Sequence, residues 1–97
     1  MIEKNLLTRI GDVSVYLVDG NAVKKECSMD FVEGGNDKAY PTFIPDGEVW
    51  IDRLISPKEW IPIMVHELSE RLLMSKGMSY ERAPSLDATR NRRVRQG

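Results

Sequence analysis

The spacing of the apolar residues changes near Ser56, and this change constrains the fold more than any other feature of the chain. Before Ser56, apolar and polar residues alternate in residues 12–20 and 48–55, which is the pattern of a strand with one buried face. After it, the apolar residues of 61–76 recur every three or four positions, as in a helix. The sequence therefore predicts an α+β fold, in which a small, mainly antiparallel sheet of about three strands packs on a long helix.

The expected strands are residues 12–20, 24–35 and 48–55. The alternation in residues 24–35 would place Cys27 on the apolar face, as a small buried residue and not as a nucleophile. In residues 48–55, Val49 and Ile51 share one face. Trp50 and Asp52 share the other, so that face is expected to be half exposed.

The start and end of the long helix carry recognisable signals. Ser56 can cap the free amides, Pro57 suits the first helical position, and Glu59 can complete a capping box. Pro62 indicates a kink or a short first turn, and Gly77 indicates the end of the helix. We expect a helix over about residues 56–76.

The 97 residues are expected to form one domain, with a core over about residues 12–84 and a shorter second helix after Ser79. A single cysteine excludes an internal disulfide and favours the reducing cytoplasm. No apolar run approaches the roughly 20 residues that span a bilayer, so no membrane role is expected. All 15 acidic residues lie at or before Asp87, which leaves residues 88–97 as a basic tail.

The wheel of residues 61–76, drawn at about 100° per residue, has two unlike sides. The predicted core stripe is Ile61, Met64, Val65, Leu68 and Leu72. His66 and Glu70 lie together on nearly the opposite side, with Glu67 at its edge. Because Ile63, Leu73 and Met74 share that side, these polar residues are expected in a partly covered groove.

A carboxylate in such a groove needs a partner, because an unpaired buried charge costs several kcal/mol. Three partners remain open from the sequence. Arg71 or Arg82 could pair with Glu70 or Glu67; a protonated His66 could pair with Glu70; or a divalent metal such as Zn²⁺ could bridge His66 and Glu70. In the metal hypothesis Glu67 is the candidate catalytic base for a bound water.

Three strings of the chain resemble a known group of proteins. "FVEGG", "FIPDGEVWID" and "HELSERLLMSKGMSYERA" are similar to small, poorly characterised bacterial and phage proteins that have a zincin-like, metallopeptidase-type core. The resemblance covers about residues 12–84. It implies that residues 48–52 form an edge strand above the helix with the HE motif, where a peptide or protein partner would lie.

The resemblance also implies a second histidine in a later Y-x-x-A-H string. Here that string is "YERAP", and Pro84 stands in the histidine's place. Glu81, Asp87 and Asp52 are possible substitutes for the third ligand. Since zinc is held poorly by two ligands, the HExxE motif is predicted to be the remnant or variant of a metal site and not a working peptidase centre.

A non-enzymatic function is the alternative. The chain would then be a phage or mobile-element module that binds a protein or nucleic acid with its basic tail, whose cations are Arg90, Arg92, Arg93 and Arg95.

Overall fold

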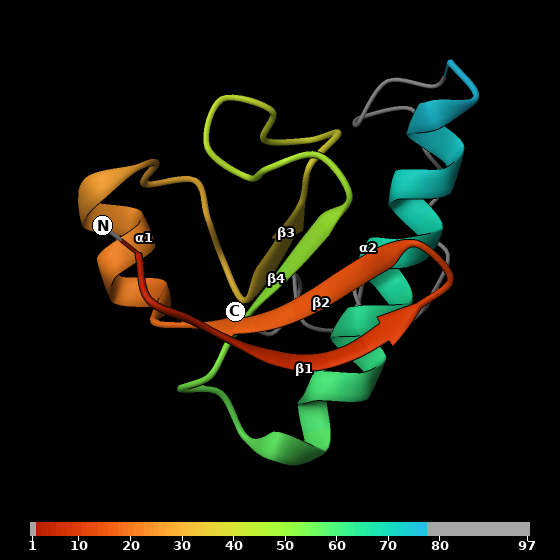
Figure 1. Cartoon of the computed structure of the whole chain (residues 1–97). Coiled ribbons are helices and arrows are strands. Elements are labelled where there is room, and N and C mark those ends of the chain that lie inside the picture. Colours follow the sequence, from red (N-terminus) through yellow and green to blue (C-terminus); the bar gives the residue numbers. More distant parts are fainter. Residues whose placement is uncertain (1, 78–97) are drawn as a thin grey trace, which may run out of the picture.

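The computed structural model describes residues 2–77 of the chain (Figure 1). Four strands and two helices follow one another, with a short 3₁₀ turn, η1, ahead of the second helix. The elements are β1 Lys4–Ile10, β2 Val13–Val18, α1 Gly20–Glu26, β3 Gly34–Asn36, β4 Glu48–Asp52, η1 Pro57–Glu59 and α2 Trp60–Ser75. The predicted α+β class is confirmed, and so is the long helix, because η1 and α2 together cover residues 57–75.

The four strands form one mixed sheet in the order β1-β2-β4-β3. β1 and β2 are antiparallel and meet at a turn where Gly11 has a φ of 61°. β2 and β4 are parallel, with Val15 beside Val49. β3 runs antiparallel to β4 and forms the far edge. The sheet thus has one strand more than predicted, and β4 lies inside it, not at an edge.

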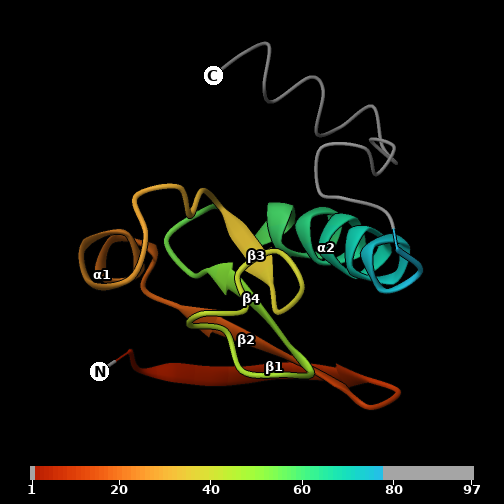
Figure 2. The same cartoon turned by 90° about the horizontal axis from the view of Figure 1, so that it is seen from above.

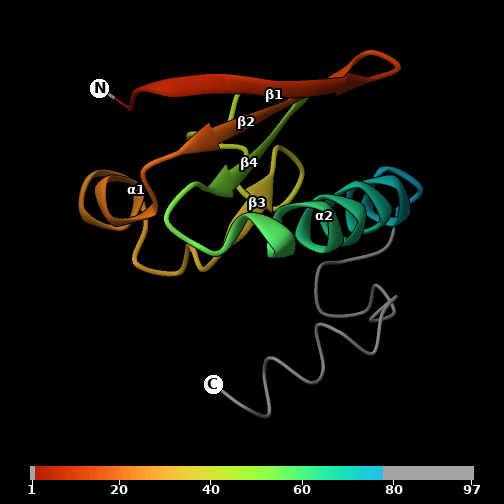
Figure 3. The same cartoon turned by 90° about the horizontal axis from the view of Figure 1, so that it is seen from below.

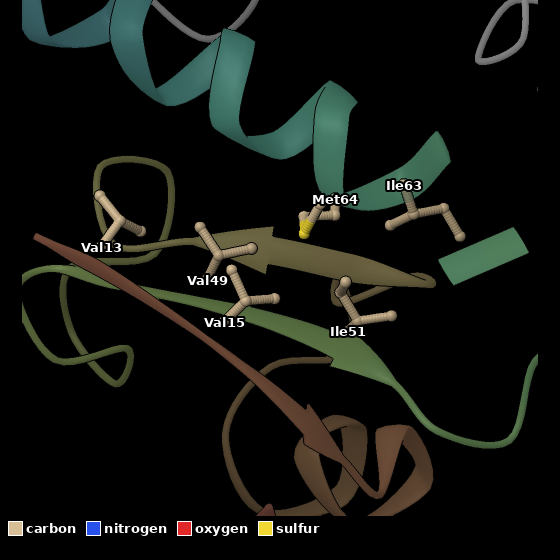
Figure 4. Close-up of a cluster of buried hydrophobic side chains, with 6 residues drawn as sticks. All are labelled: Val13, Val15, Val49, Ile51, Ile63 and Met64. Atoms are coloured by element: carbon tan, nitrogen blue, oxygen red, sulfur yellow. The ribbon is translucent and has the colours of Figure 1, made fainter. Parts of the chain in front are cut away.

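Helix α2 covers one face of the sheet. The alternation of β2 and β4 places Val13, Val15, Val49 and Ile51 on this face, where they pack with Ile63 and Met64 of α2 (Figure 4). This cluster forms the core between α2 and the sheet.

The opposite face is covered by α1 and by the chain between α1 and β4, so that the sheet lies between the two helices (Figures 2 and 3). The buried residues here are Val18, Val23, Phe31, Ile44 and Trp50. Trp50 is 4% exposed and Asp52 8% exposed. The prediction that their face is half exposed is therefore wrong, because a covering segment from elsewhere in the chain fills it.

Two further predictions about the first half are wrong. Residues 24–35 do not form a strand: Asp19 caps α1 by accepting hydrogen bonds from the amides of Asn21 (3.0 Å) and Ala22 (3.2 Å), and only Gly34–Asn36 joins the sheet. Cys27, at the end of α1, is exposed instead of buried. Strand β1 is not among the predicted strands. It lies at an edge of the sheet and leaves both Leu6 and Ile10 about half exposed, so its sequence lacks the pattern of a strand with one buried face.

Within residues 2–77, no helix combines the length and the apolar character that crossing a membrane requires.

Candidate metal centre

Helix α2 presents the site, and its first turns follow from the local sequence. Pro57 occupies the start of η1, where the missing amide hydrogen costs nothing. This 3₁₀ turn is the short first turn that Pro62 predicts. Ser56 makes no side-chain cap hydrogen bond, so the predicted capping box is not formed. The helix ends as predicted, with Gly77 at a φ of 98° and its amide donating to the Met74 carbonyl (3.0 Å).

The buried face of α2 is not the predicted one. Its buried residues are Ile63, Met64, His66, Glu67 and Glu70. Of the predicted core stripe, Met64 is buried and Leu68 is partly buried, whereas Ile61, Val65 and Leu72 are each more than half exposed. The helix therefore turns its polar HE motif inward and most of its aliphatic stripe outward.

His66 and Glu70 lie one helical turn apart and face each other. His66 Nε2 is 3.2 Å from Glu70 Oε2, and each side chain is 4% exposed. This confirms the prediction that the two residues share one side of the helix, and it shows them buried more completely than a partly covered groove would leave them.

Glu67 projects toward the edge strand β3. Its Oε1 accepts a hydrogen bond of 2.9 Å from Asn36 Nδ2, and Glu67 is 7% exposed. Asn36 is fully buried. One ligand atom from each of His66, Glu67 and Glu70 lies within 4.8 Å of the other two, so an imidazole and two carboxylates converge on one small volume.

The close approach of β3 to α2 depends on Gly34. A Cβ at this position would lie 2.9 Å from Ile63 Cγ2 and 3.0 Å from the Trp50 carbonyl oxygen. Since the carbonyl belongs to the paired backbone of β4, it cannot move aside. A residue without a side chain therefore lets β3 bring Asn36 to Glu67.

Asp37, the residue after Asn36, binds the next turn of α2. Arg71 donates to both of its carboxylate oxygens, from Nε to Oδ1 (2.6 Å) and from Nη2 to Oδ2 (3.1 Å). The Gly47 amide also donates to Oδ2 (2.7 Å). The consecutive residues Asn36 and Asp37 thus bind Glu67 and Arg71, which lie one helical turn apart on α2.

The electrostatics of this pair favour its charged form. Burial by itself raises the pKa of Asp37, but the hydrogen bonds from Arg71 and from the Gly47 amide outweigh it, so that the pKa of this carboxyl lies below its ordinary value of 3.8. The hydrogen bond to Asp37 likewise raises the pKa of Arg71. Arg71, one of the cations considered for Glu67 or Glu70, makes its bidentate contact with Asp37.

The other predicted site residues are not brought to this centre. Asp52, a suggested third ligand, instead accepts two hydrogen bonds at Oδ1, from the amide of Gly20 at the start of α1 (3.1 Å) and from the amide of Leu54 (3.0 Å). Strand β4, the suggested partner-binding edge, is paired on both sides. The remaining candidates lie outside the described residues: Glu81, Arg82, Pro84, Asp87, the second helix after Ser79, and Arg90, Arg92, Arg93 and Arg95.

Sequence reasoning missed Asn36 and Asp37. The string Gly34-Gly35-Asn36-Asp37 has the composition of a turn, which gives no indication of a contact with the helix. Residues 36–39 do turn, since Asn36 Oδ1 accepts from the amides of Lys38 (2.9 Å) and Ala39 (3.0 Å). No signal in the local sequence shows that the same side chain also reaches α2.

Comparison with known proteins gives no relative: no family model, curated protein sequence or solved structure matches the chain significantly.

Proposed function

We propose that the protein binds a divalent metal ion of the zinc class through His66 and Glu70, with Glu67 as the adjoining carboxylate. The observation that carries the proposal is the buried 3.2 Å approach of His66 Nε2 to Glu70 Oε2. Two ligands that each lie about 2.0–2.1 Å from a tetrahedral zinc ion are separated by about 3.3 Å. The two side chains therefore already have the spacing of adjacent zinc ligands.

The composition of the centre supports the same proposal. Zinc accepts imidazole nitrogen and carboxylate oxygen, and both are present here.

A hydrogen bond between His66 and Glu70 explains the same distance without a metal. In that case the imidazole donates to the carboxylate and the pair only links two turns of the helix. The two explanations differ in what they predict for metal uptake, so an assay separates them.

We further propose that this is a variant metal centre related to the zincin arrangement and lacking peptidase activity. In support, the edge strand β3 lies against the HE helix, although the resemblance assigned the edge position to residues 48–52. His66 is the only histidine of the chain, and Pro84 stands where the resemblance places another. A bound zinc ion would lower the pKa of a water, for which Glu67 is the nearby base.

The test is metal analysis of the full chain purified without chelator, followed by titration with Zn²⁺ and Co²⁺. We expect one equivalent of metal in the wild type, and an affinity at least about tenfold lower in His66→Ala and Glu70→Gln, since each loses a ligand. Glu26→Gln, at an exposed carboxylate of α1, is the matched control and should bind as the wild type does. A folded wild type that takes up no metal, or uptake that His66→Ala retains, overturns the proposal.

Peptidase activity is tested separately on an unstructured protein substrate with the zinc-loaded chain. We expect no zinc-dependent cleavage above the background of the Glu67→Gln variant. Cleavage that requires both zinc and Glu67 would show an active enzyme and would replace this part of the proposal.

A further inference from the structure

The side chain of Asn36 is fixed in one orientation by the backbone that follows it. Its Oδ1 accepts hydrogen bonds from the amides of Lys38 and Ala39, at 2.9 and 3.0 Å. An amide oxygen is the only atom of asparagine that can accept from two N–H groups, so Nδ2 must point the other way. That direction leads to Glu67 Oε1, at 2.9 Å.

The position of Asn36 is fixed as well as its orientation. It is fully buried and lies in β3, opposite Val49 of β4. The next residue, Asp37, is held by Arg71 and by the Gly47 amide. The donor that meets Glu67 is therefore set in place by the sheet on one side and by an ion pair on the other.

The chemical consequence concerns how Glu67 can bind an ion. The hydrogen bond from Asn36 fixes the position and orientation of the Glu67 carboxylate beside His66 and Glu70. Turning this carboxylate away from Asn36 would break a buried hydrogen bond. Outer hydrogen bonds of this kind orient metal ligands and commonly change metal affinity by about 10- to 100-fold.

We propose that Asn36 is a positioning residue of the metal centre, which holds the Glu67 carboxylate in a fixed orientation beside the ion of His66 and Glu70. This inference rests on the proposed metal binding and adds to it the residue that orients the adjoining carboxylate. The competing explanation is structural: the hydrogen bond only fastens β3 to α2, and the ion would not sense its loss.

The experiment uses the visible absorption of the Co²⁺-substituted full chain, because its intensity and band positions report the number and geometry of the ligands. Asn36→Ala removes the hydrogen bond to Glu67. We expect it to weaken Co²⁺ binding by about 10- to 100-fold and to change the spectrum. Asn36→Ser, whose hydroxyl can still accept from the Lys38 and Ala39 amides but is too short to donate to Glu67, is the second variant in case the first does not fold.

The control is Lys4→Met, which removes a part-buried ion pair elsewhere in the fold, the 2.7 Å contact of Lys4 Nζ with Glu48 Oε1, without touching Asn36, Asp37 or the Glu67 hydrogen bond. We expect it to be less stable than the wild type but to keep the wild-type cobalt spectrum. If the wild type binds Co²⁺ and a folded Asn36 variant has the wild-type affinity and spectrum, Asn36 is only structural. If the wild type binds no Co²⁺, both the metal proposal and this inference fail.

Discussion

The two sides of helix α2 are the reverse of what their side chains suggest. On the outer side Ile61, Val65 and Leu72 are 55%, 51% and 54% exposed. On the inner side His66, Glu67 and Glu70 are 3%, 7% and 3% exposed. The contrast shows that a helix is oriented by the partners that other segments supply, and that the count of apolar residues on each side does not decide it.

Exposing an apolar side chain and burying a polar side chain have unequal costs, and this difference explains how the arrangement is stable. An aliphatic side chain left in water forgoes a gain of about 1.5–3 kcal/mol, but it creates no penalty. A buried polar group needs a hydrogen-bond partner, and Asn36 supplies one to Glu67. On the same helix, Arg71 also finds a bidentate partner in Asp37. The segment of residues 36–37 thus supplies partners to two polar residues of α2, while the apolar outer side needs none.

The sharpest test of the contrast uses two isoleucines of opposite sides. Ile63 is 2% exposed and Ile61 is 55% exposed. Ile63→Ala should lower the free energy of unfolding by about 3–4 kcal/mol, because it leaves a cavity against the sheet, whereas Ile61→Ala should change it by less than about 0.5 kcal/mol. Urea unfolding followed by circular dichroism measures both. Equal losses in the two variants would mean that the helix is rotated from the orientation described.

The next largest effect is expected at Arg71. Replacing it with methionine keeps the aliphatic part of the side chain but leaves the Asp37 carboxylate, 2% exposed, without its bidentate partner. Removing the partner of a charge-assisted hydrogen bond of this kind costs about 1–3 kcal/mol. Arg53→Met is the control, since its ion pairs with Glu3 and Asp19 are at 4.0 Å and exposed, and such pairs contribute about 0–1 kcal/mol. Similar unfolding midpoints for the two variants would contradict the buried pair.

The same pair gives stability a dependence on pH. The pKa of Asp37 is lower in the folded protein than its ordinary value of 3.8, so the unfolded chain takes up the proton first as the pH falls. The pair therefore stabilises the fold fully above about pH 5, and this contribution is lost as the pH falls through the folded pKa. The measurement is the difference in unfolding free energy between wild type and Asp37→Asn. It should shrink from about pH 5 to about pH 2, and a difference that stays constant would be inconsistent with a depressed pKa.

The smallest effect is expected on the outer side of α2. Val65→Ser or Leu72→Ser should each change the unfolding free energy by no more than about 0.5 kcal/mol, because both side chains are already half in water. Met64→Ser, one position from Val65 and 8% exposed, is the control and should be clearly destabilised. A loss of more than about 2 kcal/mol in either outer variant would show that this side is covered.

The parts of the fold that the sequence predicts are those in which local pattern and burial agree. β2 and β4 alternate cleanly, and their two faces do belong to two different clusters. Pro57 and Gly77 mark the ends of the helical segment. His66 and Glu70 come together because positions four apart on a helix are neighbours, whatever surrounds them.

The failures arise where distant segments decide the outcome. The alternation of Cys27, Met29 and Phe31 imitates a strand, but only Phe31 is buried, and it packs on one face of the sheet with Val18 and Trp50. Helix α2 faces inward with its HE motif because residues 36–37 reach it from β3. The contacts of Asn36 and Asp37 with α2 join residues more than thirty positions apart, and periodicity within one segment contains no information about them.

The parallel pairing of β2 with β4 also sets the order in which the chain can assemble. The β1–β2 hairpin is local, and hairpins form in about 1–10 μs. The edge of β2 that faces away from β1, however, stays unpaired until β4 is in place. This pairing requires closing a loop of about 30 residues. During synthesis, β2 therefore leaves the ribosome with an open edge and with aliphatic side chains awaiting α2. A nascent chain halted before Glu48 would expose that edge, and we expect aggregation and chaperone capture to concentrate at this stage of its production.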